Sequence, residues 1–363
     1  MHQRQLLPLI GLLVALAAAG AAARAEAPAA FAASLTGGRV YVAFGANVLV
    51  ARHGRFNALN EALTPAFATQ LDVSPATVGA GPSGKLGLVL YEASAPALLR
   101  RIRLDFAGDY RAGSSRDSAA PYTVATAFGP AAQFALLSID GQQGLLFRST
   151  PAEDGVARLR TEDRTLAGAL RLRADVPIER ATLSPFIGFI AESARQRYTL
   201  DFHLAGTGVS HDYAIDESVR ARRLGGEAGA DLALRLADAI VLHAGGSFAY
   251  LHQRTRLDGS DCLTVSNIGG GAPCGAWATS VAFTDSRMAW RTDMWLGIAI
   301  EAAPLNFSAM GMGRYDSAVA GVANPVATQA IFLGGAPRPG PVAIRYSGRW
   351  SYGGMLKATV SFP

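Results

Sequence analysis

The sequence predicts an all-β protein whose strands, about twelve of them, close into one antiparallel transmembrane β-barrel. Three observations carry this prediction. The chain begins with a short apolar export segment, its apolar residues then alternate at period two over unusually long stretches, and short and long connections alternate between these stretches.

The N-terminal segment has the order of a secretory signal peptide. A polar start that includes Arg4 precedes the apolar run Leu6–Ala19, and Ala23-Arg24-Ala25 matches a small-x-small cleavage site. The apolar run is short for a membrane-spanning helix. We therefore expect residues 1–25 to be the signal peptide, 26–37 a periplasmic N-terminal segment, and 38–363 a transmembrane β-barrel with external loops.

The chain has many apolar residues, but they are distributed along the sequence and do not form long runs. Half of the chain is hydrophobic and the mean hydropathy is +0.20. Nevertheless, no uninterrupted apolar segment after residue 25 approaches the roughly 20 residues of a transmembrane helix. The net charge of +5 falls to about +3 without the signal peptide, and Lys85 and Lys357 are the only lysines. Because no basic cluster stands without acids nearby, we expect no nucleic-acid partner.

The period-two alternation is clearest at the C-terminus. From Ile344 to Phe362 every second residue is apolar or small, whereas Arg345, Arg349 and Lys357 lie on the other face. Strands of soluble proteins usually have about five or six residues, but this alternation persists for about nineteen. Such a strand can cross a bilayer at a tilt, with one face toward lipid and the other toward a polar interior.

Similar stretches upstream complete the predicted barrel. The twelve predicted strands are 38–52, 82–93, 98–111, 121–137, 143–150, 164–178, 182–204, 219–236, 239–257, 280–302, 305–317 and 342–362. We predict tight connections near 94–96, 140–141, 179–180, 237–238 and 303–304, with long ones between. Short periplasmic turns and long external loops, with an even strand count, are typical of closed bacterial barrels.

The closing segment Ser351–Phe362 carries a resemblance to a known superfamily. It has a glycine pair, alternating apolar residues and a final aromatic, and it resembles the terminal strand of Gram-negative outer-membrane β-barrels. Pro363 departs from that pattern because it follows the aromatic residue. The resemblance implies location in the cell outer membrane, contact with outer-membrane lipids, and recognition of the C-terminal strand by the barrel assembly machinery.

Cys262 and Cys274 are the only cysteines, and they bracket a Gly/Asn/Ser-rich stretch of an exported chain. A disulfide that closes an external loop is the natural interpretation. The chain-entropy model gives such a bond about 3 kcal/mol. We expect no metal and no cofactor, since no His or acidic cluster accompanies the pair.

Three further segments could carry chemistry. Gly79–Lys85 matches most of a P-loop, but Leu86 replaces the Ser/Thr that would hold Mg²⁺, so a loop before a strand is favoured. Phe56–Phe67 has helical spacing and is either a plug helix in the barrel mouth or a helix on the outer rim. Asp201, His203 and His211-Asp212 resemble omptin-like surface proteases in composition alone, which implies no catalytic role.

Hydrolytic barrels that cleave lipids pair His and Ser two residues apart on one strand. None of His53, His203, His211, His243 and His252 has a serine at that position. His243 and Ser247 share a face but lie roughly 13 Å apart along a strand, whereas nucleophile activation needs about 3 Å. A membrane-embedded lipid or peptide hydrolase therefore stays an alternative only, and we assign no catalytic residue.

Charged residues on the inward faces are the most informative functional feature. The predicted lumen-lining residues are Arg101, Arg103, Asp105, Arg171, Arg173, Asp175, Arg223, Glu227, Asp231, Arg235, Arg287, Arg291, Asp293, Arg345 and Arg349. If water fills the lumen, this basic surplus predicts a passive porin-like channel for small solutes with weak anion preference. If these residues pair with each other instead, they close the barrel, which then serves as a structural or surface-interaction barrel.

Overall fold

The computed structural model describes residues 40–52, 56–57, 72–73, 76–93, 99–119, 125–126, 129–130, 132–149, 154–205, 209–267, 271–302, 304–325, 331 and 334–362. The predicted signal peptide and N-terminal segment lie outside these residues, as does the predicted helix from residue 58 onward. Phe56 and Asn57, where that helix was expected to begin, form the short strand β2 instead. No helix in the described part has the length and hydropathy to cross a membrane.

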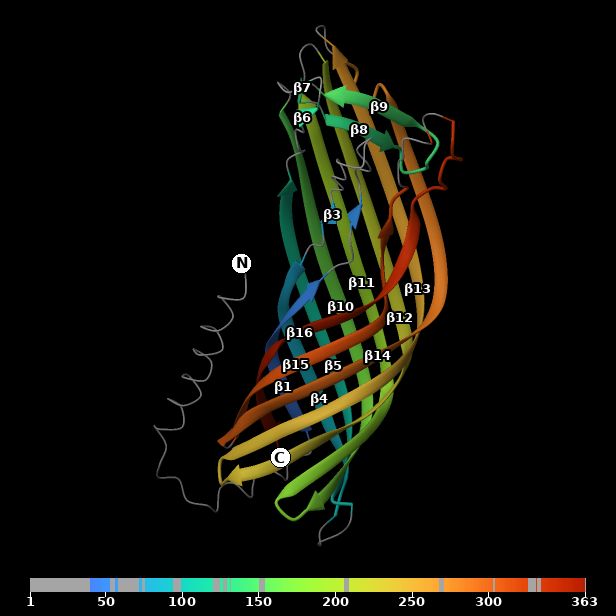
Figure 1. Cartoon of the computed structure of the whole chain (residues 1–363). Helices are drawn as coiled ribbons and strands as arrows, with labels where there is room; N and C mark the ends of the chain where they lie inside the picture. The colour runs from blue at the N-terminus through green and yellow to red at the C-terminus, as the bar shows by residue number, and fades with distance from the viewer. Residues whose placement is uncertain are drawn as a thin grey trace.

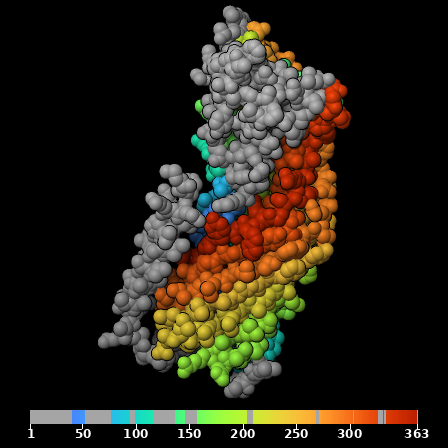
Figure 2. All heavy atoms as spheres, in the orientation of Figure 1, coloured from blue at the N-terminus to red at the C-terminus, as the bar shows by residue number. Residues whose placement is uncertain are grey.

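The architecture is a closed antiparallel barrel (Figure 1). The ring order is β1-β16-β15-β14-β13-β12-β11-β10-β5-β4, and β1 closes it by pairing with both β4 and β16. The ring strands are β1 (Val40–Arg52), β4 (Ala76–Glu92), β5 (Arg101–Ala119), β10 (Asp154–Ile178), β11 (Ala181–Ala205), β12 (Val209–Ala237), β13 (Ile240–Asn267), β14 (Trp277–Ala302), β15 (Leu305–Ala323) and β16 (Ala343–Phe362). In Figure 2 the later strands cross the lower part of the molecule as tilted bands.

The ring has ten strands rather than the twelve expected. The predicted strands 121–137 and 143–150 do not enter it, because β8 (Ala132–Leu137) and β9 (Gly144–Ser149) pair only with each other. Three two-stranded pairs lie apart from the ring, and they are β2 with β3 (Asp72–Val73), β6 (Ala125–Thr126) with β7 (Gly129–Pro130), and β8 with β9. Since both misplaced strands belong to one connection, the strand count stays even.

Several segments expected to be loops are strand. β10 begins at Asp154 rather than at 164, β12 begins at Val209, and β13 continues to Asn267. The P-loop-like stretch Gly79–Lys85 lies inside β4, so it is neither a nucleotide loop nor the expected connecting loop. The tight connections expected after Ile178 and after Ala237 are confirmed.

The long strands pass through two environments, and the polarity of their two faces changes part-way along, as β12 shows. On β12 the outward face carries exposed Leu232 and Leu224 and then changes to exposed Arg220. The inward face changes in the opposite sense, from buried Glu227 to fully buried Ile215. The lower part therefore has the inverted polarity of a membrane barrel, and the upper part, here called the extension, has the polarity of a soluble β-structure.

An apolar core fills the extension. It gathers inward side chains from β10 to β15 with residues of the β8–β9 hairpin and of the chain before β16, among them Leu159, Leu200, Phe202, Tyr213, Ile215, Leu257, Leu263, Trp277, Ile139 and Val342. The hairpin lies at the end of the barrel opposite to the C-terminus (Figure 1). Its turn is held by Ile139, whose N–H donates to Asp261 at 3.0 Å and whose carbonyl accepts from Val342 N at 2.7 Å. The turn includes Gly141 at φ 74°, where a Cβ would lie 2.5 Å from Pro339 O.

Candidate functional site: the lumenal ion-pair network

The lumen contains charged side chains in two layers, and the lower layer lies at mid-height of the membrane part. Asp105 is fully buried; its Oδ2 forms ion pairs with Lys85 Nζ at 2.7 Å and Arg173 Nε at 3.2 Å, and its Oδ1 accepts a hydrogen bond from the Tyr41 hydroxyl. Arg173 also pairs with Asp231. These residues come from β1, β4, β5, β10 and β12, so side chains of half the ring meet at one height.

Two further pairs complete the lower layer. Arg103 Nη2 lies 2.6 Å from Asp175 Oδ1, which also accepts from Ser184. Arg171 forks onto Glu227 with Nε–Oε1 and Nη2–Oε2 distances of 2.6 and 3.0 Å, reaching from β10 past β11 to β12. Such bidentate pairs fix side-chain geometry as well as charge.

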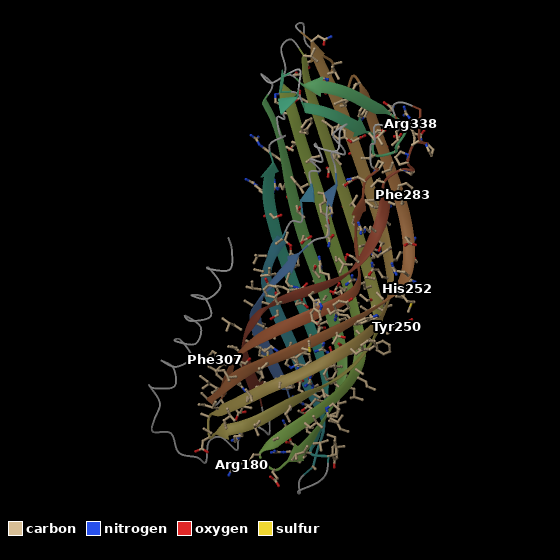
Figure 3. The ribbon with its side chains drawn as sticks, viewed as in Figure 1. Arg180, Tyr250, His252, Phe283, Phe307 and Arg338 are labelled. Carbon is tan, nitrogen blue, oxygen red and sulfur yellow. A yellow bond between two sulfur atoms is a disulfide. The ribbon has the colours of Figure 1, made fainter. Side chains whose placement is uncertain are left out.

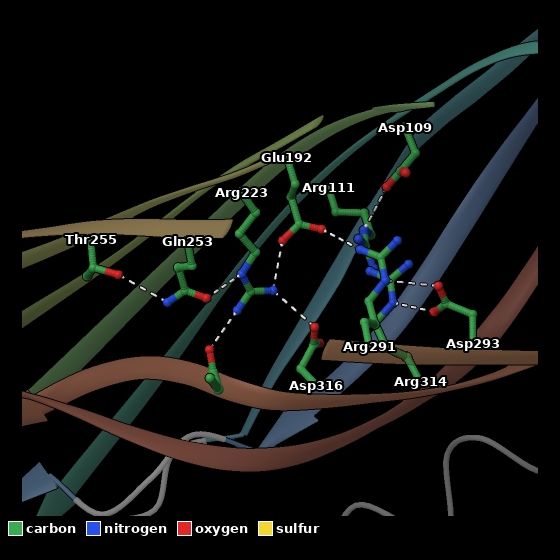
Figure 4. Close-up of polar contacts among 11 residues, drawn as sticks. Asp109, Arg111, Glu192, Arg223, Gln253, Thr255, Arg291, Asp293, Arg314 and Asp316 are labelled. Atoms are coloured by element: carbon green, nitrogen blue, oxygen red, sulfur yellow. Dashed lines mark hydrogen bonds and ion pairs between the residues drawn. The ribbon is translucent and has the colours of Figure 1, made fainter. Parts of the chain in front are cut away.

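The upper layer is centred on Glu192 of β11 (Figure 4). Its Oε1 accepts from Arg223 Nη1 at 3.1 Å, and its Oε2 accepts from Arg291 Nη1 at 2.9 Å. Arg223 also binds Asp316 Oδ1 at 3.0 Å, and Arg291 Nε lies 3.0 Å from Asp293 Oδ2. These five residues come from β11, β12, β14 and β15 and are each at least nine-tenths buried.

The periphery of the upper layer extends the network without a break. Arg314 Nε donates to Asp293 at 2.6 Å, Arg223 Nε donates to Gln253 at 2.8 Å, and Gln253 donates to Thr255. Arg111 pairs with Asp109 at 3.0 Å beside it (Figure 4). Apart from the neighbouring Arg111–Asp109 pair, the side chains of the upper layer thus form one connected network from Thr255 to Arg314.

The outer surface at the same height is apolar and exposed. Ile187 and Phe189 on β11 are 64% and 69% exposed, and Leu224 on β12 is 62% exposed. Aromatic contacts run along this belt from Phe248, stacked on Trp290, through Tyr315 to Trp350, with ring centroids 5.0 to 6.0 Å apart. A closed ring with an apolar outside, aromatic girdle and charged inside is stable only in a bilayer. The chain is a transmembrane β-barrel.

Comparison with known proteins adds no narrower assignment. No family model and no curated protein matches the sequence. Solved structures that align with the barrel include the outer membrane protease OmpT of Escherichia coli, with 8% identity over 89% of this chain and 96% of that chain at a TM-score of 0.40. They also include the AIDA-I autotransporter transport unit of E. coli, with 10% identity over 92% and 97% at 0.25. A Pseudomonas aeruginosa FadL homologue aligns with 8% identity over 89% and 90% at 0.20. These scores are too low to support an argument about function.

A cavity lies in the barrel beyond the upper layer, toward the extension. Arg111, Arg349, Asp163 and Ser351 are among its lining residues, together with members of the upper layer. Arg349 Nε and Nη1 are buried and have no hydrogen-bond partner among the described residues. Four inward arginines, Arg111, Arg223, Arg314 and Arg349, line this cavity against the three acids Asp163, Glu192 and Asp316.

Four predicted lumen residues lie away from the two layers. Arg101 pairs with Glu92, and Arg235 with Glu301 at 2.8 Å, both at the end of the barrel with short turns. Arg287 is exposed and its guanidinium lies 4.3 Å from the ring centroid of Tyr346.

Arg345 differs from the expectation because it is exposed on the outside. Its neighbours Ile344 and Tyr346, expected to face lipid, pack against the apolar core. At this height β15 has a bulge between Asp316 and Val319, which shifts its register against β16. Above it, the two faces of β16 exchange their environments.

Several network residues were missing from the sequence-based set. Glu192 was concealed because the same face of β11 carries the apolar Phe186 and Ile190. Arg314 and Asp316 were overlooked although their strand was predicted. Lys85 could have been found from the alternation, since it lies on the opposite face of its strand to the exposed Leu86 and Leu88.

The remaining candidates do not assemble into a recognisable catalytic centre. His203 Nδ1 lies 2.5 Å from Asp212 Oδ1, but both side chains are about half exposed on the outer surface. Among the described residues, no group of three or more His, Cys, Asp or Glu is arranged to hold a metal. Cys262 and Cys274 form a disulfide with a Cα–Cα distance of 5.0 Å, though Cys262 belongs to the strand β13 and not to a loop.

Proposed function

We propose that this outer-membrane barrel is closed to passive diffusion and serves as a membrane anchor that presents its extension at the cell surface. The observation that carries the proposal is the Glu192–Arg291 pair, which joins β11 to β14 across the lumen at 2.9 Å with both side chains buried. An open channel needs a continuous water-filled path between such groups.

Opening a path through the two layers would be costly. The charged groups of Asp105, Arg173, Glu192, Arg223 and Arg291 are buried and compensated by their partners. Breaking one partner away from a buried pair costs on the order of 3–5 kcal/mol. Several pairs would have to separate together, so thermal opening would be rare.

The extension supports a role at the surface. Its outer surface carries exposed ion pairs such as Arg197–Asp216. Its interior is packed with apolar side chains and is covered by the β8–β9 hairpin. A barrel needed only for diffusion has no use for a packed core beyond the membrane. The partner would bind the extension or the connections that it holds in place.

Conductance of the purified barrel in planar bilayers tests this function. We expect no steady conductance from the parent, and frequent openings from the double variant Glu192→Ala/Arg291→Ala, which removes the central pair. The matched control Arg235→Ala/Glu301→Ala removes an exposed pair at the rim and should stay closed. Stable, ohmic steps from the parent protein would contradict the proposal.

A second candidate is the passive channel for small solutes with weak anion preference. The arginine surplus around the cavity favours it, because cations would be repelled there. If the parent conducts, Arg349→Glu should shift the reversal potential toward cations. Arg345→Glu changes the same charge on the exposed outside and should leave the ion preference unaltered.

A further inference from the structure

A compact group of arginines lies on the outer surface of the barrel, directly above the apolar belt. It consists of Arg164 on β10, Arg195 on β11, Arg220 and Arg222 on β12, and Arg254 and Arg256 on β13, here called the basic band. All six side chains point outward and are exposed. They are distinct from the inward arginines of the ion-pair network.

The strand register places these arginines directly opposite one another. Arg195 is paired with Arg164 on one side and with Arg220 on the other. Arg220 is in turn paired with Arg256, and Arg222 with Arg254. Like charges opposite each other on neighbouring strands destabilise a sheet, so an uncompensated cluster of this kind needs a counter-charge.

The protein itself supplies little of that counter-charge. Arg256 pairs with Asp258 at 2.7 Å, and Arg164 lies 3.9 Å from Glu162. Among the described residues, no ion pair is formed by Arg220, Arg222 or Arg254. Six positive charges therefore face two negative ones, at opposite edges of the band.

The position of the band indicates where its ligand lies. Leu166 follows Arg164 by two residues on the lipid side, and Leu224 follows Arg222 in the same way. On β13 the sequence runs from Tyr250 and His252, which project outward in Figure 3, to Arg254. The band thus lies at the headgroup level of the leaflet on the side of the extension, which is the outer leaflet.

We propose that the basic band binds the phosphate groups of the phosphorylated glycolipid in the outer leaflet, with the lipid's acyl chains lying against the apolar belt beneath. Arginine is suited to this role because its planar guanidinium binds phosphate oxygens in a bidentate manner. Continuity with the belt favours a lipid over a free anion, since one molecule then satisfies both surfaces. This inference does not depend on whether the lumen is open.

The test measures binding of bisphosphorylated lipid A to the detergent-solubilised barrel. The variant is Arg220→Gln/Arg222→Gln/Arg254→Gln, which removes three arginines without ion pairs; Arg195, which has no ion pair among the described residues either, is kept because its Nε donates to the Ser218 hydroxyl. From the contribution of individual arginines near an anionic surface, we expect binding on the order of 100-fold weaker. The control Arg158→Gln/Arg160→Gln/Arg197→Gln removes three exposed outward arginines farther from the belt and should change binding less than about 3-fold.

Two further measurements keep the outcome decisive. The Lys version of the test variant retains the charges and should restore most of the affinity, and a heat-dependent gel shift checks that every variant is folded. The parent should bind dephosphorylated lipid A at least about tenfold more weakly, and inorganic phosphate or phosphatidylglycerol vesicles should not compete effectively. Equal loss of binding in the test and control variants, or effective competition by either anion, would overturn the proposal.

Discussion

Glu192 on β11 and Arg291 on β14 are joined at 2.9 Å although two strands separate them in the ring. The second oxygen of Glu192 binds Arg223, so one carboxylate holds two arginines from different strands. Because the three side chains are buried, their charges are compensated by each other and by the neighbouring Asp316 and Asp293. This relationship makes the lumen a structural element of the barrel, with measurable consequences.

Replacing Glu192 by alanine should destabilise the barrel by about 3–5 kcal/mol, because Arg223 and Arg291 would lose their shared carboxylate. Equilibrium unfolding in urea, followed by tryptophan fluorescence, measures this change. The control Glu301→Ala removes the exposed partner of Arg235 and should cost less than about 1 kcal/mol. Equal decreases in the free energy of unfolding in both variants would show that Glu192 contributes no more to stability than an exposed ion pair.

Replacing Asp261 by alanine should release the β8–β9 hairpin from the extension. The buried carboxylate accepts from Ile139 N at 3.0 Å, from the Tyr213 hydroxyl at 2.9 Å, and from Trp277 Nε1 at 3.3 Å. Each unpaired buried donor would cost about 1–3 kcal/mol. Hydrogen exchange should show lost protection at Ile139, with the membrane strands unchanged. Asp258→Ala, on the exposed face of β13, is the control, and unaltered exchange at Ile139 in the Asp261 variant would refute the prediction.

The extension should lose stability as the pH rises, because of Glu217. This fully buried side chain lies beyond the apolar belt, and burial raises its pKa from about 4.5 to about 8. The folded state therefore holds a proton that the unfolded state has released. Stability is full below about pH 4.5 and falls as the pH rises through 8, by about 1.4 kcal/mol per unit of pKa difference.

The measurement is the rate of limited proteolysis of the extension at pH 6 and pH 9. We expect faster cleavage of the parent at pH 9 after correction for protease activity. Glu217→Gln mimics the protonated side chain, so its cleavage should be nearly independent of pH in this range. The same pH response in both proteins would exclude Glu217 as its source.

Replacing Cys262 and Cys274 by serine should leave the barrel assembled, because its strands are closed by their own hydrogen bonds. The local cost is about 3 kcal/mol in the chain-entropy model, confined to the end of β13 and the start of β14. The heat-dependent gel shift should persist, whereas protease sensitivity near residues 268–276 should increase. Loss of the folded band would contradict this separation between the disulfide and the barrel.

Period-two alternation was sufficient to predict the closed all-β fold and most membrane strands. The ranges predicted for β11, β14 and β16 agree with the structure within a few residues at each end. Lipid contact requires an apolar outer face on every membrane strand. Membrane strands can therefore be recognised from the alternation within each strand alone. The prediction failed at β8 and β9, since alternation does not reveal which partner a strand will have.

The sequence by itself determined which residues of a membrane strand share a face, and therefore that Arg173, Arg223 and Arg291 lie opposite to lipid-facing neighbours. Only the tertiary structure decided the rest. It placed Glu192 between Arg223 and Arg291, and it extended β10, β12 and β13 beyond the membrane. There the solvent changes from lipid to water, so the same alternation continues with its faces exchanged. Which carboxylate reaches which guanidinium depends on ring closure, which local periodicity does not encode.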